Sequence, residues 1–224
     1  MGKFKLIGMG PGGVDYVLPV AKKALREAHV WAGAPRQLEL AREICPNEEK
    51  IVFKYKNNLE ELLNFIRVRG RQLLAVLVSG DPGFHSLLGI ISRNFSASEY
   101  EVIPGVSSFQ TAMARLGVPW QSDLLSSCHG RDFDHLCQAA LDALRTGRRA
   151  IFLTDARRHP GRIAADLLEA GAADCPVWLA ENVTLRGEWL RESTLKELAE
   201  RGGEGEEWEL CVIVVGVLQP RFEP

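Results

Sequence analysis

Hydrophobic positions follow two alternating patterns along this 224-residue chain. Continuous apolar runs of strand length, such as 73–78, alternate with segments such as 59–66 whose apolar residues are spaced as on one helix face. Because these runs do not alternate with polar residues, we expect strands that are buried on both faces, as in a parallel sheet covered by helices. The pattern predicts an α/β fold, of the doubly wound class in the first half of the chain.

The predicted elements fall into two groups separated by residues 117–122, where Gly and Pro interrupt the periodicity. We therefore predict two α/β domains, residues 1–118 and 119–224, with a ligand cleft between them. Predicted strands cover residues 3–7, 30–32, 51–53, 73–78, 100–103, 124–127, 150–154, 176–180, 188–190 and 208–216, and predicted helices cover 18–28, 35–45, 59–69, 109–116, 133–144, 162–169 and 195–200.

Composition narrows the class of protein. The net charge of −2 gives no basic excess for nucleic acid, and neither a signal peptide nor an apolar run of membrane-spanning length is visible, so we expect a cytoplasmic protein. The five cysteines are odd in number and contain no CxxC pair, so we expect reduced thiols. The histidines show no HxH or HExxH spacing, and no metal site is predicted.

The first predicted strand runs into Gly8-x-Gly10-x-x-Gly13, which matches the dinucleotide-binding fingerprint letter for letter. Three features oppose that interpretation. The next helix pattern starts only near Leu18, Pro11 lacks an N–H group in a loop that also carries Asp15, and residues 30–34 supply no acidic partner for a ribose. The turn instead suits a ligand without phosphates, such as S-adenosylmethionine.

Two more loops follow predicted strands, at 79–84 and 104–108. Ligands of open α/β sheets bind beyond the carboxyl ends of the strands, so we expect the three loops to face one site. Asp81 either holds ligand hydroxyl or ammonium groups or is a turn residue, because Asp-Pro-Gly is strong turn chemistry. Ser107 and Ser108 either contact the ligand or cap the helix that starts there.

With these loops in place, the chain resembles the tetrapyrrole methylase superfamily. The resemblance covers nearly the whole chain and rests on six motifs in order: Gly8–Gly12, Ser79–Phe84, Pro104–Ser108, Ile151–Thr154, Pro176–Asn182 and Val212–Gly216. Each motif alone is weak. The branch that it resembles most methylates carbon-5 of precorrin-7 or of its cobalt form, and this likeness rests on residues 80–88, 104–110 and 127–132, with Cys128 where relatives often have leucine.

The resemblance implies two α/β domains, a homodimer and S-adenosylmethionine as the methyl donor. Some relatives carry a second, decarboxylating methyltransferase for carbon-15, which we expect here on another polypeptide. The implied donor contacts are Pro11, Asp81, Phe84, Ser107 and Ser108, with backbone of Leu153 and Thr154 and an edge around Asn182 and Leu210.

A corrin precursor bears acetate and propionate arms, so its site should present cations, and arginine matches carboxylates bidentately. The expected substrate contacts are Arg131, Arg157 and Arg158, near which His159 and Arg162 also lie. A solvated helix face is the alternative for Arg162 and also for the run 157–159, although that run directly follows a strand end. His129 is the candidate base, with a structural role as its alternative.

Three other functions stay open at this point. The chain could methylate another tetrapyrrole such as uroporphyrinogen, or a protein side chain as in the diphthamide branch. It could also be a catalytically silent binding module, although the intact loops at 8–12, 79–84 and 104–108 oppose this.

Overall fold

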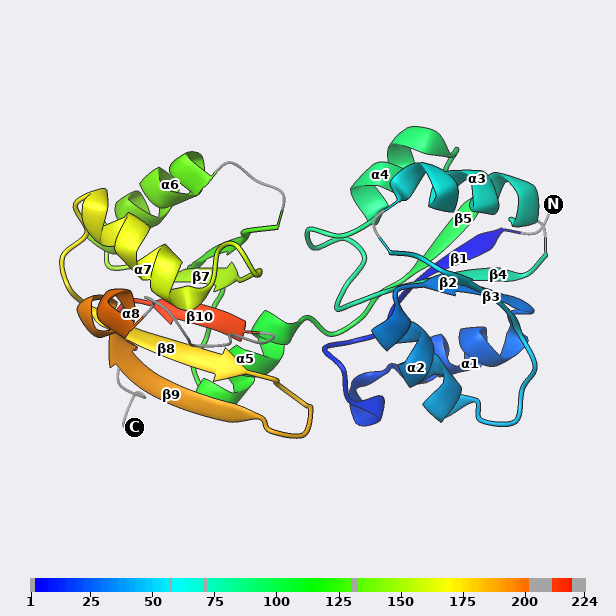
Figure 1. Ribbon diagram of the computed structural model, residues 1–224, viewed down its shortest axis with the longest axis horizontal. Helices are drawn as coiled ribbons and strands as arrows, with labels where there is room; N and C mark the ends of the chain where they lie inside the picture. Colours follow the sequence, from blue (N-terminus) through cyan, green and yellow to red (C-terminus); the bar gives the residue numbers. More distant parts are fainter. Residues whose placement is uncertain (1–2, 57, 71, 130–132, 202–210, 219–224) are drawn as a thin grey trace. The chain divides into compact units, whose positions relative to one another are not determined.

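The computed structural model describes residues 3–56, 58–70, 72–129, 133–201 and 211–218 (Figure 1). Its contacts divide the chain into two compact units, Met1–Ser107 and Ser108–Pro224. The boundary that we predicted, between residues 118 and 119, instead follows helix α5 (Ser108–Leu116). The division falls before α5 because this helix packs on strands β7 (Ala150–Leu153) and β10 (Cys211–Val215) of the second unit.

The first unit is a five-stranded parallel sheet with the order β3-β2-β4-β1-β5. Figure 1 shows helices α1 and α2 on one face of this sheet and α3 and α4 on the other. Strand residues contribute to a separate core on each face, Ile7 to the one with α1 and α2 and Leu6 to the other, so the predicted burial of both faces is confirmed. The bounds are β1 Phe4–Gly8, α1 Pro19–Glu27, β2 Val30–Gly33, α2 Pro35–Ile44, β3 Ile51–Lys54, α3 Leu59–Arg69, β4 Leu74–Val78, α4 Leu88–Asn94 and β5 Tyr100–Ile103.

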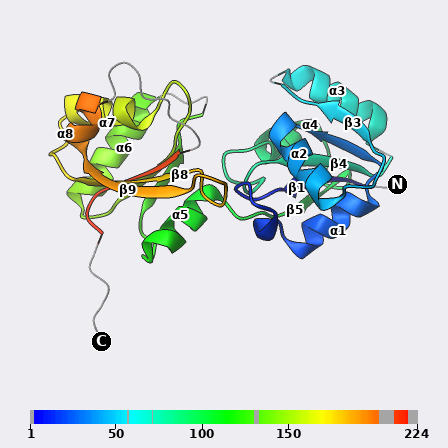
Figure 2. The same cartoon turned by 60° about the horizontal axis from the view of Figure 1, so that its bottom comes forward.

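The second unit contains a mixed sheet with the order β6-β7-β10-β8-β9. Only β6 and β7 pair in parallel among its described strands, because β10 inserts antiparallel between β7 and β8. Helices α6, α7 and α8 share one core with the sheet, and Figure 2 shows α5 on the opposite face. The bounds are β6 Leu124–Ser127, α6 Phe133–Arg145, α7 Pro160–Glu169, β8 Pro176–Glu181, β9 Trp189–Thr194 and α8 Leu195–Arg201.

Local sequence signals placed most elements within a few residues. The predicted helix cap is confirmed, since the Asn58 side chain accepts a hydrogen bond of 3.2 Å from the Glu61 amide. The late first helix is also confirmed, because the short 3-10 helix η1 (Val14–Tyr16) stands between the glycines and α1. Helix α4 was not predicted, because its seven residues are too few to show a helical period.

Candidate functional site

Three loops meet at the carboxyl edge of the first unit's sheet. We call them the glycine loop (Gly8–Gly13), the aspartate loop (Ser79–Phe84) and the proline loop (Pro104–Ser107), which follow β1, β4 and β5. Gly10 and Gly80 form an isolated antiparallel bridge in which the Gly80 amide donates to the Gly10 carbonyl over 2.9 Å. The first two loops, which follow the neighbouring parallel strands β1 and β4, are therefore joined backbone to backbone.

Two of the loop glycines, Gly8 and Gly105, have no room for a side chain because the neighbouring loops approach them closely. A Cβ atom at Gly8 would lie 2.6 Å from both the Gly105 nitrogen and the Gly80 carbonyl oxygen. A Cβ atom at Gly105 would overlap the Gly80 carbonyl oxygen and lie 2.8 Å from the Gly8 carbonyl carbon. Of the glycines that match a dinucleotide fingerprint, Gly8 thus serves the packing of the three loops against one another.

Asp81 holds two of these loops together. Its Oδ1 accepts a hydrogen bond of 2.7 Å from the Gly83 amide, and its Oδ2 accepts one of 3.1 Å from the Gly105 amide. The first bond is the turn interaction that the Asp-Pro-Gly sequence predicts. The second spans 24 residues and links the aspartate loop to the proline loop. Both carboxylate oxygens are therefore engaged, and each keeps a second lone pair for a ligand hydroxyl or ammonium group.

The other expected donor contacts of the first unit lie in the same three loops. Pro11 is buried, Phe84 is half-buried, and Ser107 is buried at the end of the proline loop. The Phe84 ring lies 4.6 Å from the ring of His85, whose φ of 50° is left-handed. Ser108 is the first residue of α5 and belongs to the second unit.

Arg36 also lies at this edge, although the sequence analysis did not select it. It is the second residue of α2, which begins just past the end of β2, and its Nη2 donates a hydrogen bond of 2.9 Å to the Ser79 hydroxyl. The available signal was a cation directly after a strand of the parallel sheet.

In the second unit, Leu153 and Thr154 lie at the end of β7 and are tied into the sheet. The Leu153 carbonyl accepts a hydrogen bond from the Cys128 amide, and both the amide and the hydroxyl of Thr154 donate to the Cys211 carbonyl, at 3.2 and 2.9 Å. Asn182 follows β8 with a left-handed φ of 50°. The fixed backbone at this edge is one requirement for the contacts that we expected.

His129 follows β6 and is exposed, with its Nδ1 3.1 Å from the Ser127 hydroxyl. The Ser127 hydroxyl also accepts a hydrogen bond of 3.3 Å from the His129 amide. Nε2 can act as a base only in the tautomer in which Nδ1 carries the proton and donates a hydrogen bond to the Ser127 hydroxyl.

The arginines expected to bind substrate differ in their surroundings. Arg158 and Arg162 both pair with Asp166, at 2.7 and 2.8 Å, and the Arg158 guanidinium also stacks over the Phe133 ring. One carboxylate thus offsets part of the positive charge of this pair. Arg157 is exposed, and its amide is held by Asp155. Arg131 and Leu210 lie outside the described residues, so the structure does not place them.

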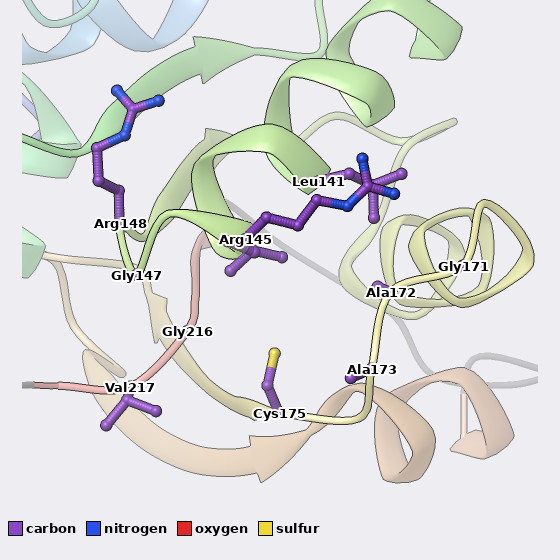
Figure 3. A pocket seen from close by; sticks show the side chains of 11 residues that line it. Leu141, Arg145, Gly147, Arg148, Gly171, Ala172, Ala173, Cys175, Gly216 and Val217 are labelled. Carbon is purple, nitrogen blue, oxygen red and sulfur yellow. The ribbon is translucent and has the colours of Figure 1, made fainter.

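A separate cavity of about 260 Å³ lies at the other edge of the second sheet (Figure 3). It is bordered by residues that precede β7 and follow β10. Thr154 lies at the opposite edge of the sheet, because it follows β7 and donates to Cys211 at the start of β10. In Figure 3 the half-buried Cys175 faces this cavity. Burial raises the pKa of the Cys175 thiol, which keeps it protonated near neutral pH. None of the described residues expected to bind donor or substrate lines this cavity.

Across the described part of the chain, no helix combines the length and apolarity needed to cross a bilayer. Within the same residues, no group of three or more His, Cys, Asp or Glu side chains is arranged to hold a metal ion.

Comparison with known proteins identifies a family that this chain matches. Residues 3–199 match the family described as Tetrapyrrole (Corrin/Porphyrin) Methylases. A probable cobalt-precorrin-7 C(5)-methyltransferase from Methanocaldococcus jannaschii is 29% identical over 87% of this chain and 90% of its own length. The cobalt-precorrin-7 C(5)-methyltransferase of Salmonella typhimurium is 30% identical over 83% of this chain and 89% of its own length.

Solved structures agree with this result. The crystal structure of a cobalamin biosynthesis precorrin-6Y methylase from Archaeoglobus fulgidus has 25% identity and a TM-score of 0.71, covering 96% of this chain and 97% of the other. A uroporphyrin-III C-methyltransferase of Thermus thermophilus, solved in complex with S-adenosylhomocysteine, has 20% identity and a TM-score of 0.75, covering 97% of this chain and 98% of the other. The second likeness shows the fold alone.

Proposed function

The chain belongs to the tetrapyrrole methylase family, and we propose that it transfers a methyl group from S-adenosylmethionine to carbon-5 of a corrin precursor in cobalamin biosynthesis. The observation that carries this proposal is the similarity, over more than four fifths of the chain, to two cobalt-precorrin-7 C(5)-methyltransferases of matching length. We propose cobalt-precorrin-7 or precorrin-7 as the methyl acceptor.

The loops of the first unit fit a donor that carries no phosphate. They offer backbone groups, a buried Pro11 with no N–H to give to a phosphate, and one carboxylate, that of Asp81. A carboxylate suits ribose hydroxyls or an ammonium group, both of which S-adenosylmethionine carries. We therefore propose Pro11, Asp81, Phe84, Ser107 and Ser108 as donor contacts, together with the backbone of Leu153 and Thr154.

The reaction needs little from the protein besides positioning. The electron pair of the acceptor carbon forms a bond to the methyl carbon, the carbon–sulfur bond breaks, and its electrons stay on sulfur as S-adenosylhomocysteine. Holding the two reactants in line supplies most of the rate enhancement in such a displacement. The macrocycle gives up a proton or redistributes its charge, and His129 is the base that we propose for that step.

The proposed base has a direct test. Replacing His129 with Asn should lower kcat by about 100-fold and leave the affinity for S-adenosylhomocysteine unchanged. An unchanged kcat would assign His129 to a structural role with Ser127.

The assigned arginines have unequal support. Arg157 is exposed and its guanidinium is available for an acetate or propionate arm, and Arg131 stays a proposal from the sequence alone. Arg158 would have to share its charge between Asp166 and the substrate. Replacing Arg157 with Ala should raise KM for the corrin precursor, and an unchanged KM would remove Arg157 from the site.

Two measurements test the proposed function. Calorimetric titration with S-adenosylhomocysteine should show one site per chain, and a chain that does not bind would be a silent module or act on another ligand. Incubation with S-adenosylmethionine and precorrin-7, with and without cobalt, should add 14 mass units to the macrocycle, as one methyl group replaces one hydrogen atom. If neither form of precorrin-7 gave a methylated product and uroporphyrinogen did, the proposed substrate would be wrong and uroporphyrinogen would take its place.

We further propose a cytoplasmic homodimer that works beside a separate carbon-15 methyltransferase and decarboxylase. The cysteines support a reducing compartment, since Cys45, Cys128, Cys137, Cys175 and Cys211 are all free thiols. Sedimentation of the purified protein tests the assembly, and a monomer at micromolar concentration would contradict it.

A further inference from the structure

Arg36 carries a guanidinium nitrogen, Nη1, that is buried within the protein. Nη2 donates to the Ser79 hydroxyl, but Nη1 is buried and has no hydrogen-bond partner among the residues that the structure describes. Burial also lowers the pKa of Arg36. A guanidinium nitrogen that loses water without gaining a hydrogen bond is costly, by more than a neutral group would be.

The position of Arg36 in the fold points to a function for this unsatisfied group. Strand β2 is paired with β4, with Gly33 opposite Leu77, so α2 starts beside the loop that follows β4. The Ser79 hydroxyl that Arg36 contacts is followed directly by Gly80 and Asp81, which join the aspartate loop to the other two loops. The unpartnered nitrogen therefore lies at the edge of the sheet where the three loops meet.

An anion is the ligand that satisfies such a group. Arginine presents a planar pair of N–H groups that matches the two oxygens of a carboxylate. Both reactants of the proposed reaction carry carboxylates: the donor has one on its methionine part, and the corrin precursor has several on its acetate and propionate arms.

We propose that Arg36 is a binding residue whose Nη1 takes a carboxylate of one of the two reactants, while the Ser79 hydroxyl holds the guanidinium in place through Nη2. This inference rests on the proposed function. It adds to the site a cation in the first unit, separate from the arginines that the sequence predicted in the second unit.

The test replaces Arg36 with Met, which keeps an unbranched apolar side chain and removes the charge. The matched control is Arg42→Met, an exposed arginine on the same helix. For each protein, calorimetry gives the affinity for S-adenosylhomocysteine and for decarboxylated S-adenosylmethionine, and steady-state assays give kcat and KM for cobalt-precorrin-7.

If Arg36 binds the donor, Arg36→Met should lower the affinity for S-adenosylhomocysteine by roughly 10- to 100-fold, as expected for one charged hydrogen-bonded contact. The affinity for decarboxylated S-adenosylmethionine should stay unchanged. If it binds the acceptor, KM for cobalt-precorrin-7 should rise by a similar factor while donor affinity stays the same. Arg36→Lys should recover only part of either loss, because an ammonium lacks the planar fork.

The stability of the ligand-free protein distinguishes a binding arginine from a structural one. Removing a half-buried cation whose Nη1 lacks a hydrogen bond to the described residues should leave the urea midpoint of the ligand-free protein unchanged or raise it, whereas removing a structural arginine lowers it. Donor affinities and KM within threefold of the wild type would overturn the inference. A wild-type protein that neither binds the donor nor methylates the macrocycle would instead overturn the proposed function, which keeps the two failures distinct.

Discussion

Replacing Asp81 with Asn tests whether this side chain is the link between the aspartate and proline loops. The carboxylate accepts from Gly83 over 2.7 Å and from Gly105 over 3.1 Å, but an amide has one oxygen and therefore keeps one of these bonds. We expect the carbonyl oxygen to keep the shorter, local bond to Gly83, which turns the amide NH₂ group toward the N–H of Gly105.

The magnitude follows from the bond that is lost. A hydrogen bond to a charged group contributes about 1.5–3 kcal/mol, and Asp81 is half-buried, so water compensates part of the loss. About 2 kcal/mol corresponds to a roughly 30-fold faster exchange of the Gly105 amide by local opening. The affinity for S-adenosylhomocysteine should fall as well, because the loops are no longer fixed and the negative charge is gone.

Hydrogen–deuterium exchange on a peptide that covers 104–107 measures this effect directly. Glu101→Gln is the control, since Glu101 is an exposed acid on β5, the strand that leads into the same loop. Exchange at Gly105 that stays within threefold of the wild type would refute the link. If affinity fell without faster exchange, Asp81 would act on the ligand alone.

Three further predictions concern stability. Asp123→Asn should lower the free energy of unfolding by about 3–5 kcal/mol, because it leaves the buried Arg149 guanidinium, now paired at 2.8 Å, without its counterion. Gly105→Ala should cost about 3 kcal/mol, because its Cβ would overlap the carbonyl oxygen of the aspartate loop. The Arg115 guanidinium lowers the pKa of Glu188. The stabilisation from Glu188 is therefore present above its ordinary pKa of about 4.3 and is lost as pH falls through the lower pKa of the folded state. The decrease in the free energy of unfolding caused by E188Q, measured by urea unfolding, should be larger at pH 6 than at pH 3.

Each of these predictions has a control or a contrary outcome in the same chain. Asp142 pairs with an arginine at the surface, so Asp142→Asn should change stability by less than about 1 kcal/mol. A Cβ at Gly89 would meet only the Arg93 side chain at 4.0 Å, so G89A should be tolerated. Equal losses for Asp123 and Asp142, or for Gly105 and Gly89, would contradict the packing argument. A pH-independent effect of E188Q would contradict the ion-pair argument.

The sequence by itself determined what depends on neighbouring residues. Continuous apolar runs identified the buried strands of the first sheet, and Asn58 marked the start of α3. The Asp-Pro-Gly turn and the late start of α1 were also visible, because turns, caps and helix starts are set by residues within one or two turns of the chain. The order of the six motifs gave the family that the comparison with known proteins found.

Only the tertiary structure decided which distant groups meet. It showed that Gly8 must be small because Gly80 and Gly105 approach it, and that Asp81 bonds to an amide 24 residues away. It also paired Arg158 with Asp166. Such contacts follow from strand order, and the positions of β10 between β7 and β8 and of β4 between β1 and β2 are not encoded by any local pattern.

Arg36 shows the same division most clearly. Along the chain it is one of many arginines, placed after a strand and at the start of a helix. In the fold it lies against Ser79, 43 residues further on, with one buried nitrogen unpartnered among the described residues. Hydrophobic period and turn chemistry act over a few residues, whereas desolvation of a charge depends on everything packed around it, so only the folded chain can reveal such a site.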